Sequence, residues 1–174
     1  ARDEQELTAL LEAIGVAGRL YMVGFNRRFS PHVSRLKSLL SNRVSPLMLN
    51  YRVLADPAPP DSWIHGPAGG GRVVGEVCHM LDLFNFMVGP GTELVEVDGS
   101  APLPGQGQMP GDNLVVTMRY GDGSVCNLMY TALGKKSPQN GKERIEAMWD
   151  GKTFVIDDFT RSFGAGCSAG SAGK

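Results

Sequence analysis

The strongest constraint on the fold is the alternation of apolar and polar residues in the second half of the chain. A period of two residues is typical of strands that bury one face. It predicts strands over Leu94–Val97, Leu114–Tyr120, Ser124–Thr131, Ile145–Trp149 and Thr153–Ile156. Gly121-Asp122-Gly123 and Asp150-Gly151 supply hairpin turns between neighbouring strands. These segments therefore predict a sheet that is predominantly antiparallel.

Two helices are predicted to cover this sheet. One begins at Ser30-Pro31, with a serine N-cap and proline at N1, and continues to residue 42. The other has its apolar residues three or four positions apart and ends at Gly89-Pro90. Between them, Pro46 to Leu54 alternates as a further strand. The predicted fold class is α+β, with helices packed on one face of the sheet.

The two ends of the chain differ from this central part. Leu7, Leu10, Leu11 and Ile14 share one face of a helix that Gly15 is predicted to end, and 20–23 has the pattern of a short buried strand. We expect residues 1–25 to be the last helix and strand of a Rossmann-type dinucleotide-binding domain. Residues 26–161 would form the α+β domain. The Gly/Ala/Ser-rich residues 162–174 would be an irregular tail.

Charge and composition exclude several classes of partner. The chain has 17 basic and 18 acidic residues and a net charge of −1, without the basic stripe of a nucleic-acid-binding protein. No apolar run reaches the ~18 residues of a membrane span, and the acidic N-terminal residues are unlike a signal peptide. Three widely spaced cysteines suit reduced thiols, so we assign no metal site and expect a cytoplasmic protein.

The segment from Gly69 to Asp82 carries most of the chemistry. Three glycines, which let a backbone approach a ligand closely, stand directly before a helix that contains Arg72, Glu76 and His79. Glycines before a helix N-terminus can bind an anion or a hydroxyl group, and they can also form a plain flexible loop. Backbone donors and titratable side chains therefore converge in this segment.

Together with the upstream run Gly24-Phe25-Asn26-Arg27-Arg28-Phe29-Ser30-Pro31, this segment resembles the C-terminal half of the Gfo/Idh/MocA oxidoreductases. These are NAD(P)-dependent dehydrogenases that act mostly on sugars and polyols. The chain also resembles a subgroup in which such a unit follows a zinc-type alcohol dehydrogenase module. The residues that carry this second likeness are Gly75 to His79, Asp112-Asn113 and Lys142-Glu143-Arg144 to Asp157-Asp158-Phe159.

The resemblance implies a substrate-binding and oligomerisation domain, in a homodimer or larger assembly. The parent enzyme would move hydride between NAD or NADP and a sugar, cyclitol or related alcohol. No Gly-x-Gly-x-x-Gly follows a strand in this sequence, so the cofactor would be bound mainly by an N-terminal domain outside it. We therefore expect the chain alone to be inactive.

The resemblance also implies site residues. His79 would be the catalytic acid/base, a role that requires a pKa near neutral. Many family members have an aspartate four residues before this histidine, where this chain has Gly75, and Glu76 could orient His79 from three residues away. The other implied contacts are Asn26, Arg27, Arg72 and Glu76 for the substrate, and Trp63, Gly70 and Gly71 for the cofactor.

Each of these residues also has a structural interpretation. His79 could be a hydrogen-bonded core histidine, Glu76 a helix-start carboxylate, and Arg72 part of a surface ion pair. Trp63 could pin the long loop. On those interpretations the chain would be a non-catalytic sheet module for dimerisation or protein interaction. A third possibility, beside the dehydrogenase and the sheet module, is a reductase of double bonds or imines on the same fold.

Overall fold

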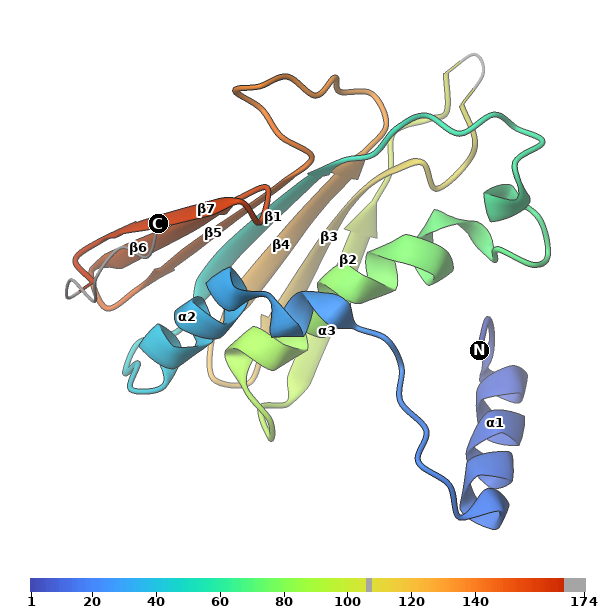
Figure 1. Ribbon diagram of the computed structural model, residues 1–174, viewed down its shortest axis with the longest axis horizontal. Helices are drawn as coiled ribbons and strands as arrows, with labels where there is room; N and C mark the ends of the chain where they lie inside the picture. Colours follow the sequence, from blue (N-terminus) through green and yellow to red (C-terminus); the bar gives the residue numbers. More distant parts are fainter. Residues whose placement is uncertain (106–107, 168–174) are drawn as a thin grey trace.

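The computed structural model describes residues 1–105 and 108–167, and within these ranges seven strands form one sheet with helices on one of its faces (Figure 1). The strands are β1 (Met48–Leu54), β2 (Leu94–Ser100), β3 (Asn113–Tyr120), β4 (Val125–Thr131), β5 (Glu143–Trp149), β6 (Lys152–Asp157) and β7 (Arg161–Ala165). The helices are α1 (Glu4–Ala17), α2 (Pro31–Leu40) and α3 (Cys78–Val88), with short 3-10 helices η1 (Asn26–Phe29) and η2 (Trp63–His65) and a π-helix η3 (Val73–Val77).

The sheet is mixed, which corrects the predicted predominantly antiparallel arrangement. Its order is β2-β3-β4-β1-β5-β6-β7, and the central strands β1 and β4 are parallel, while the other neighbouring pairs are antiparallel. After β1 the chain passes through the helical layer and enters the sheet again at the β2 edge. The β3–β4 hairpin then brings β4 beside β1 in the same direction. This pairing depends on a long crossover, which local alternation does not reveal.

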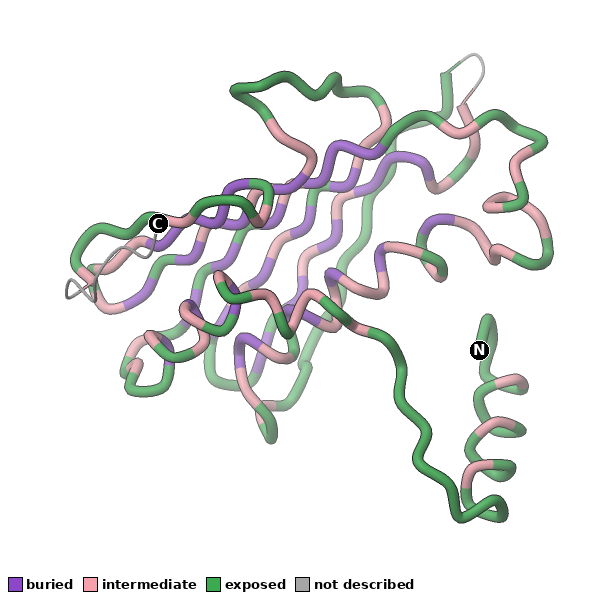
Figure 2. The backbone as a smooth tube through the Cα atoms, in the orientation of Figure 1, coloured by how far each residue is buried: buried purple, intermediate pink, exposed green. Residues whose placement is uncertain are grey.

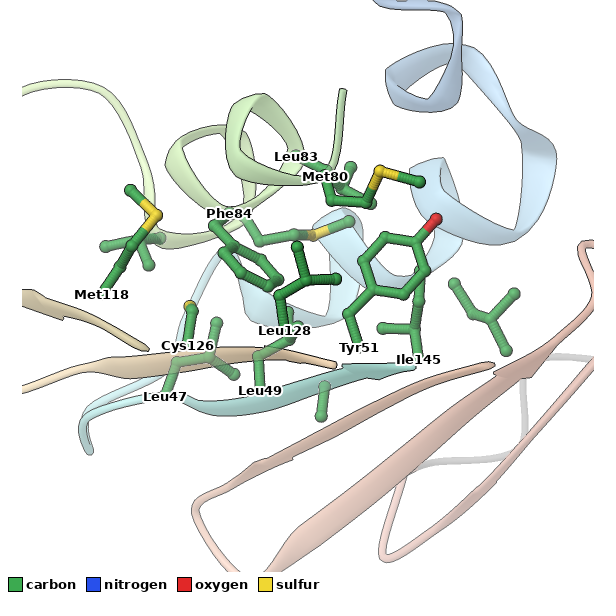
Figure 3. Close-up of a cluster of buried hydrophobic side chains, with 14 of the residues drawn as sticks. Leu47, Leu49, Tyr51, Met80, Leu83, Phe84, Met118, Cys126, Leu128 and Ile145 are labelled. Carbon is green, nitrogen blue, oxygen red and sulfur yellow. The ribbon is translucent and has the colours of Figure 1, made fainter. Parts of the chain in front are cut away.

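The hydrophobic core lies between the sheet and the layer formed by α2 and α3 (Figures 2 and 3). The predicted inward side of β1 is confirmed, because Leu47, Leu49, Tyr51 and Val53 are each at most 2% exposed. The predicted apolar face of α2 is also buried. Ser30 precedes α2 as expected, but its side chain makes no capping hydrogen bond. Apolar burial on this side of the sheet therefore fixes both helices.

The ends of the chain depart from the predictions. Helix α1 continues past Gly15 to Ala17, and Gly18 ends it with a φ of 55°. Residues 20–23 pair with no strand that the structure describes, and their side chains are exposed. At the other end, Arg161–Ala165 forms β7 beside β6, so the predicted irregular tail is wrong for residues 162–165. Residues 168–174 of that tail lie outside the described ranges.

The helix that carries the glycine-rich motif begins with an unusual turn. In η3 the backbone N–H of Cys78 bonds the carbonyl of Val73, five residues back, before α3 continues with ordinary spacing. The approach to this helix is tight, because a Cβ on Gly69 would lie 2.4 Å from the carbonyl oxygen of Ile64 in η2. Gly69 thus lets η2 pack directly against the entrance to the helix.

We predict that neighbouring residues on opposite faces of β4 differ sharply in their effect on stability. Leu128 is 0% exposed and Met129 is 46% exposed. Leu128→Ala should lower the free energy of unfolding by about 2–5 kcal/mol, because it leaves a cavity in the core. Met129→Ala should change it by less than about 1 kcal/mol. Urea denaturation of the two variants measures the difference, and equal losses would contradict the assignment of the faces.

A second prediction concerns the close contact at Gly69. Gly69→Ala should destabilise the fold by about 1–3 kcal/mol, because backbone atoms of η2 must move to admit the methyl group. Gly66→Ala is the matched control, since its Cβ would lie at an ordinary 3.5 Å from the Trp63 carbonyl. The control should leave the melting temperature nearly unchanged. A Gly69→Ala protein with the melting temperature of the wild type would show that η2 does not pack against Gly69.

Candidate functional site

A layer of polar side chains lies above the core, where β1 and β4 end and the motif helix begins. Tyr51 on β1 and Tyr130 on β4 are both buried, and Figure 3 shows the Tyr51 oxygen pointing toward the helical layer. Because β1 and β4 are parallel and in register, the two phenols rise from the same region of the sheet. Burial raises the pKa of both hydroxyls, so they are protonated at neutral pH and donate hydrogen bonds.

Arg72 is buried in this layer, only 6% exposed, and its guanidinium lies over the ring of Tyr130, 6.0 Å from the ring centroid. Its Nε donates to Asp112 Oδ1 at 3.0 Å, and Nη1 donates to the Tyr130 hydroxyl at 3.1 Å. Nη2 donates to the main-chain carbonyl of Asp56. Asp112 is itself 3% exposed. The predicted Arg72 is thus part of a buried ion pair, and the alternative of a surface ion pair is wrong.

Glu76 joins the same group of side chains. Its carboxylate accepts hydrogen bonds from the Tyr130 hydroxyl and from Lys142 Nζ at 3.0 Å, and Arg72 Nη1 lies 3.5 Å away. Burial acts to raise the Glu76 pKa, but the bonds from Tyr130 and Lys142 outweigh it, and the net shift is downward. Glu76 is therefore ionised at neutral pH.

Arg27 forms a second group of polar side chains around Tyr51. Its Nε and Nη2 each donate to the Glu143 carboxylate at 2.9 Å, and Nε is 3.1 Å from the Tyr51 hydroxyl. Tyr51 in turn donates to Glu143. Asn26 lies beside this group and, with Arg27 and Glu143, lines a hollow of about 390 Å³. Each group contains a tyrosine, a glutamate and an arginine. The two groups meet at the adjacent residues Lys142 and Glu143.

His79 follows Glu76 in the motif helix but does not pair with it. Its Nδ1 is buried and has no hydrogen-bond partner among the described residues, and its ring meets the ring of Phe25 edge-on at 5.3 Å. The expected i, i+3 contact assumes α-helical spacing, whereas Glu76 lies in the π-helical turn and faces Tyr130. A buried ring nitrogen without a partner is an exception that calls for an explanation, such as a ligand that completes its hydrogen bonding.

The residues predicted to contact the cofactor lie in the loop before the helix. Gly70 and Gly71 have φ angles of 69° and 81°, and the space around a Gly71 Cβ is open to 4 Å. Positive φ angles at both positions explain the glycines without reference to a ligand. Trp63 is 71% exposed, so it does not pin the loop as the structural alternative required.

From the sequence, Asp112, Lys142 and Glu143 were named only for the likeness to the subgroup, and Tyr51 and Tyr130 were not singled out. Tyr51, Tyr130, Asp112, Lys142 and Glu143 complete the ion pairs and hydrogen bonds of the site. His65 Nε2 also lies 4.0 Å from Asp112 Oδ1, with a side chain only 6% exposed. The available signal was a tyrosine at the inward position near the end of each central strand, because a buried phenol usually needs a polar partner.

Comparison with known proteins places this geometry in a family. Residues 42–158 match the model of the oxidoreductase family C-terminal α/β domain, Gfo/Idh/MocA. An uncharacterized oxidoreductase of Bacillus subtilis, YrbE, is 27% identical over 126 residues, which is 70% of this chain and 36% of YrbE.

Solved structures show the same fold. Levoglucosan dehydrogenase in complex with NADH and L-sorbose has a TM-score of 0.68 and 22% identity, covering 90% of this chain and 45% of that one. The WlbA dehydrogenase of Bordetella pertussis, in complex with NADH and UDP-GlcNAcA, has a TM-score of 0.71 and 18% identity, covering 94% of this chain and 51% of that one. The chain thus spans about half the length of these structures.

Within the described ranges, none of the helices is both long and apolar enough to cross a membrane. The match of the family model covers well over half of the sequence, and the fold agrees with that of the solved dehydrogenases. The chain belongs to the Gfo/Idh/MocA oxidoreductase family and contains its C-terminal α/β domain.

Proposed function

We propose that this domain binds the substrate of an NAD(P)-dependent oxidoreductase that acts on an alcohol carbon of a sugar or cyclitol. The observation that carries the proposal is the buried Nδ1 of His79, which has no hydrogen-bond partner among the described residues and lies in the helical segment that also contains Glu76. The structural interpretation of His79 required a hydrogen-bond partner within the core. The relatives named above, which include NADH complexes of sugar dehydrogenases, support the same class of reaction.

His79 would accept the proton of the reacting hydroxyl. A positioned imidazole suits this task because its ordinary pKa lies near neutral pH. Glu76 and Lys142 would hold neighbouring hydroxyls of the substrate, since both are partly exposed at the edge of the same layer. Arg27 and Arg72 would keep the geometry through Glu143 and Asp112. The chain's own contribution is thus positioning and proton transfer.

NAD or NADP, when bound, supplies the hydride acceptor. The observation in this chain that fits such a group is the open space around Gly71 at the start of the motif helix. Gly71, Gly70 and Trp63 would contact the cofactor. Most of the dinucleotide would be bound elsewhere in the parent protein. We also propose a cytoplasmic enzyme of the subgroup fused to a zinc-type alcohol dehydrogenase module, on the residues that carry that likeness.

The proposal predicts a specific defect for His79→Asn in the full-length parent enzyme. Asparagine keeps much of the volume and hydrogen-bonding capacity of histidine but cannot accept the proton, so kcat should fall by roughly 10²–10⁴-fold. Cofactor affinity and melting temperature should remain at wild-type values. Steady-state kinetics, dinucleotide titration and thermal denaturation measure these three quantities.

Glu76→Gln is the comparison variant. Because Glu76 contacts Tyr130 and Lys142 and not His79, its loss should raise KM more than it lowers kcat. Near wild-type turnover by His79→Asn at an unchanged melting temperature would end the catalytic assignment. The non-catalytic sheet module would then be the better description.

We further propose that the open face of the sheet mediates self-association. In the described part of the chain no helix covers this face, and Met48, Met129 and Met148 are exposed on it at 61%, 46% and 43%. Exposed apolar groups on one sheet face are commonly buried in a symmetric dimer.

Sedimentation velocity should therefore find a dimer or larger species at high micromolar concentration. Replacing Met129 and Met148 with lysine should shift the protein toward monomer, because the charges would be buried in the interface. Val44→Lys, a change at a 93% exposed residue outside the sheet, is the control. A wild-type protein that stays monomeric would contradict the proposed interface.

A further inference from the structure

We propose that this site selects uncharged sugars or cyclitols and rejects their carboxylate-bearing counterparts. The inference deepens the proposed function and rests on it. It derives from the way the charges in the polar layer are already paired within the protein.

The two arginines of the layer are committed to buried carboxylates. Arg27 donates twice to Glu143, and Arg72 donates to Asp112, while the arginine side chains are only 16% and 5% exposed. A substrate carboxylate that took over the bonds of either guanidinium to its carboxylate would displace that partner. The displaced carboxylate would then remain buried without a counter-charge, which is strongly unfavourable. The charge of each arginine is therefore already neutralised within the protein.

Two pairs of more accessible charged groups neutralise each other. Lys142 and Glu76, with side chains 38% and 26% exposed, form a contact of 3.0 Å. Near the same loops, Lys136 pairs with Asp56. An anion drawn to Lys142 would at the same time approach the ionised Glu76 carboxylate, and the repulsion offsets the attraction.

Hydroxyl groups suit this arrangement. An ammonium group has three donors, and Lys142 has one recorded partner, so further donors remain for a ligand. A carboxylate offers about four lone-pair directions, and Glu76 can accept from a ligand hydroxyl in addition to its present donors. A hydroxyl both donates and accepts, so a polyol can bind to the pair without changing its net charge. The layer is therefore complementary to a neutral polyol.

The test compares matched pairs of substrates with the full-length parent enzyme. Glucose and glucuronate, and galactose and galacturonate, are offered with NAD+ and with NADP+, and myo-inositol is included as a neutral cyclitol. The neutral member of a pair should have a kcat/KM at least about tenfold higher than the uronate. Equal or better use of the uronate would overturn the inference and leave the proposed oxidoreductase function intact.

A charge variant tests the stated cause. Glu76→Gln removes the repelling carboxylate and frees Lys142, so the ratio of uronate to neutral kcat/KM should rise about tenfold. Glu146→Gln is the matched control, because Glu146 pairs with Arg144 on the open face of the sheet. A general loss of folding would lower both rates and leave the ratio unchanged. An unchanged ratio in a Glu76→Gln protein that melts at the wild-type temperature contradicts the inference.

If none of these compounds is oxidised, a binding measurement tests the inference. That result would count against the proposed function for these sugars. Saturation-transfer NMR of the same pairs with the parent protein and NADH would then measure selectivity without turnover. Preferred binding of the neutral members supports the inference, and preferred binding of the uronates or no binding by either series overturns it.

Discussion

The structure depends on the ion pairs and hydrogen bonds that hold two arginine side chains, Arg27 and Arg72, above an apolar core. Each buried guanidinium is matched by a carboxylate and by the hydroxyl of a tyrosine that rises from the sheet: Arg27 by Glu143 and Tyr51, and Arg72 by Asp112 and Tyr130. The tyrosine rings belong to the core, and their hydroxyls belong to the polar layer. A buried ion pair alone seldom stabilises a fold, because desolvation opposes the attraction. Here hydrogen bonds from the guanidinium groups to the tyrosine hydroxyls are added to the ion pairs, and they connect the helical layer to both central strands.

The parallel pairing of β1 and β4 makes this arrangement possible. Two parallel strands in register present Tyr51 and Tyr130 two residues apart along the strand direction, on the same face. The chain needs the long crossover through η2, η3 and α3 to reach that pairing, and the crossover also delivers Arg72, Glu76 and His79 to the tyrosines. Topology and site are thus consequences of the same connection. An all-antiparallel meander of the same strands would not carry the motif helix across the sheet between them.

Much of the fold could be predicted from local patterns, and the failures have definite causes. The alternation around Tyr51 gave the correct buried face, since burial on one side of a strand is a local property. The place of β4 beside β1 could not be predicted from local patterns, because it depends on the long crossover after β1. Strand β7 was missed because its five residues, of which Phe163 is the one large apolar residue, pair along the edge of β6 without forming an apolar run.

The site was harder to predict than the fold. The glycine-rich motif located Arg72, Glu76 and His79 in one helix, but their acidic and phenolic partners come from distant segments. Asp112 is 40 residues from Arg72, and Tyr130 is 54 residues from Glu76. Glu76 was expected to meet His79 on α-helical spacing, and the π-helical turn directs it to Tyr130 instead. Ion pairs between distant segments require the three-dimensional structure, because any of several carboxylates could satisfy an arginine on the evidence of sequence alone.

The π-helical turn gives the motif helix a defined rotational phase. Its wider hydrogen bonding accommodates an extra residue between Arg72 and Cys78 relative to a regular α-helix. Because the wide turn absorbs this residue, the helix on either side of it keeps its phase, with Arg72 bonded to Tyr130 and the core face of α3 against the sheet. The residues inside the turn, Glu76 among them, take positions that α-helical spacing would not give them. Removal of one residue would restore α-helical spacing, so it would leave both flanks in place and re-aim only the side chains between them. Segment length, independent of residue identity, is therefore a variable through which this fold can acquire a different binding surface.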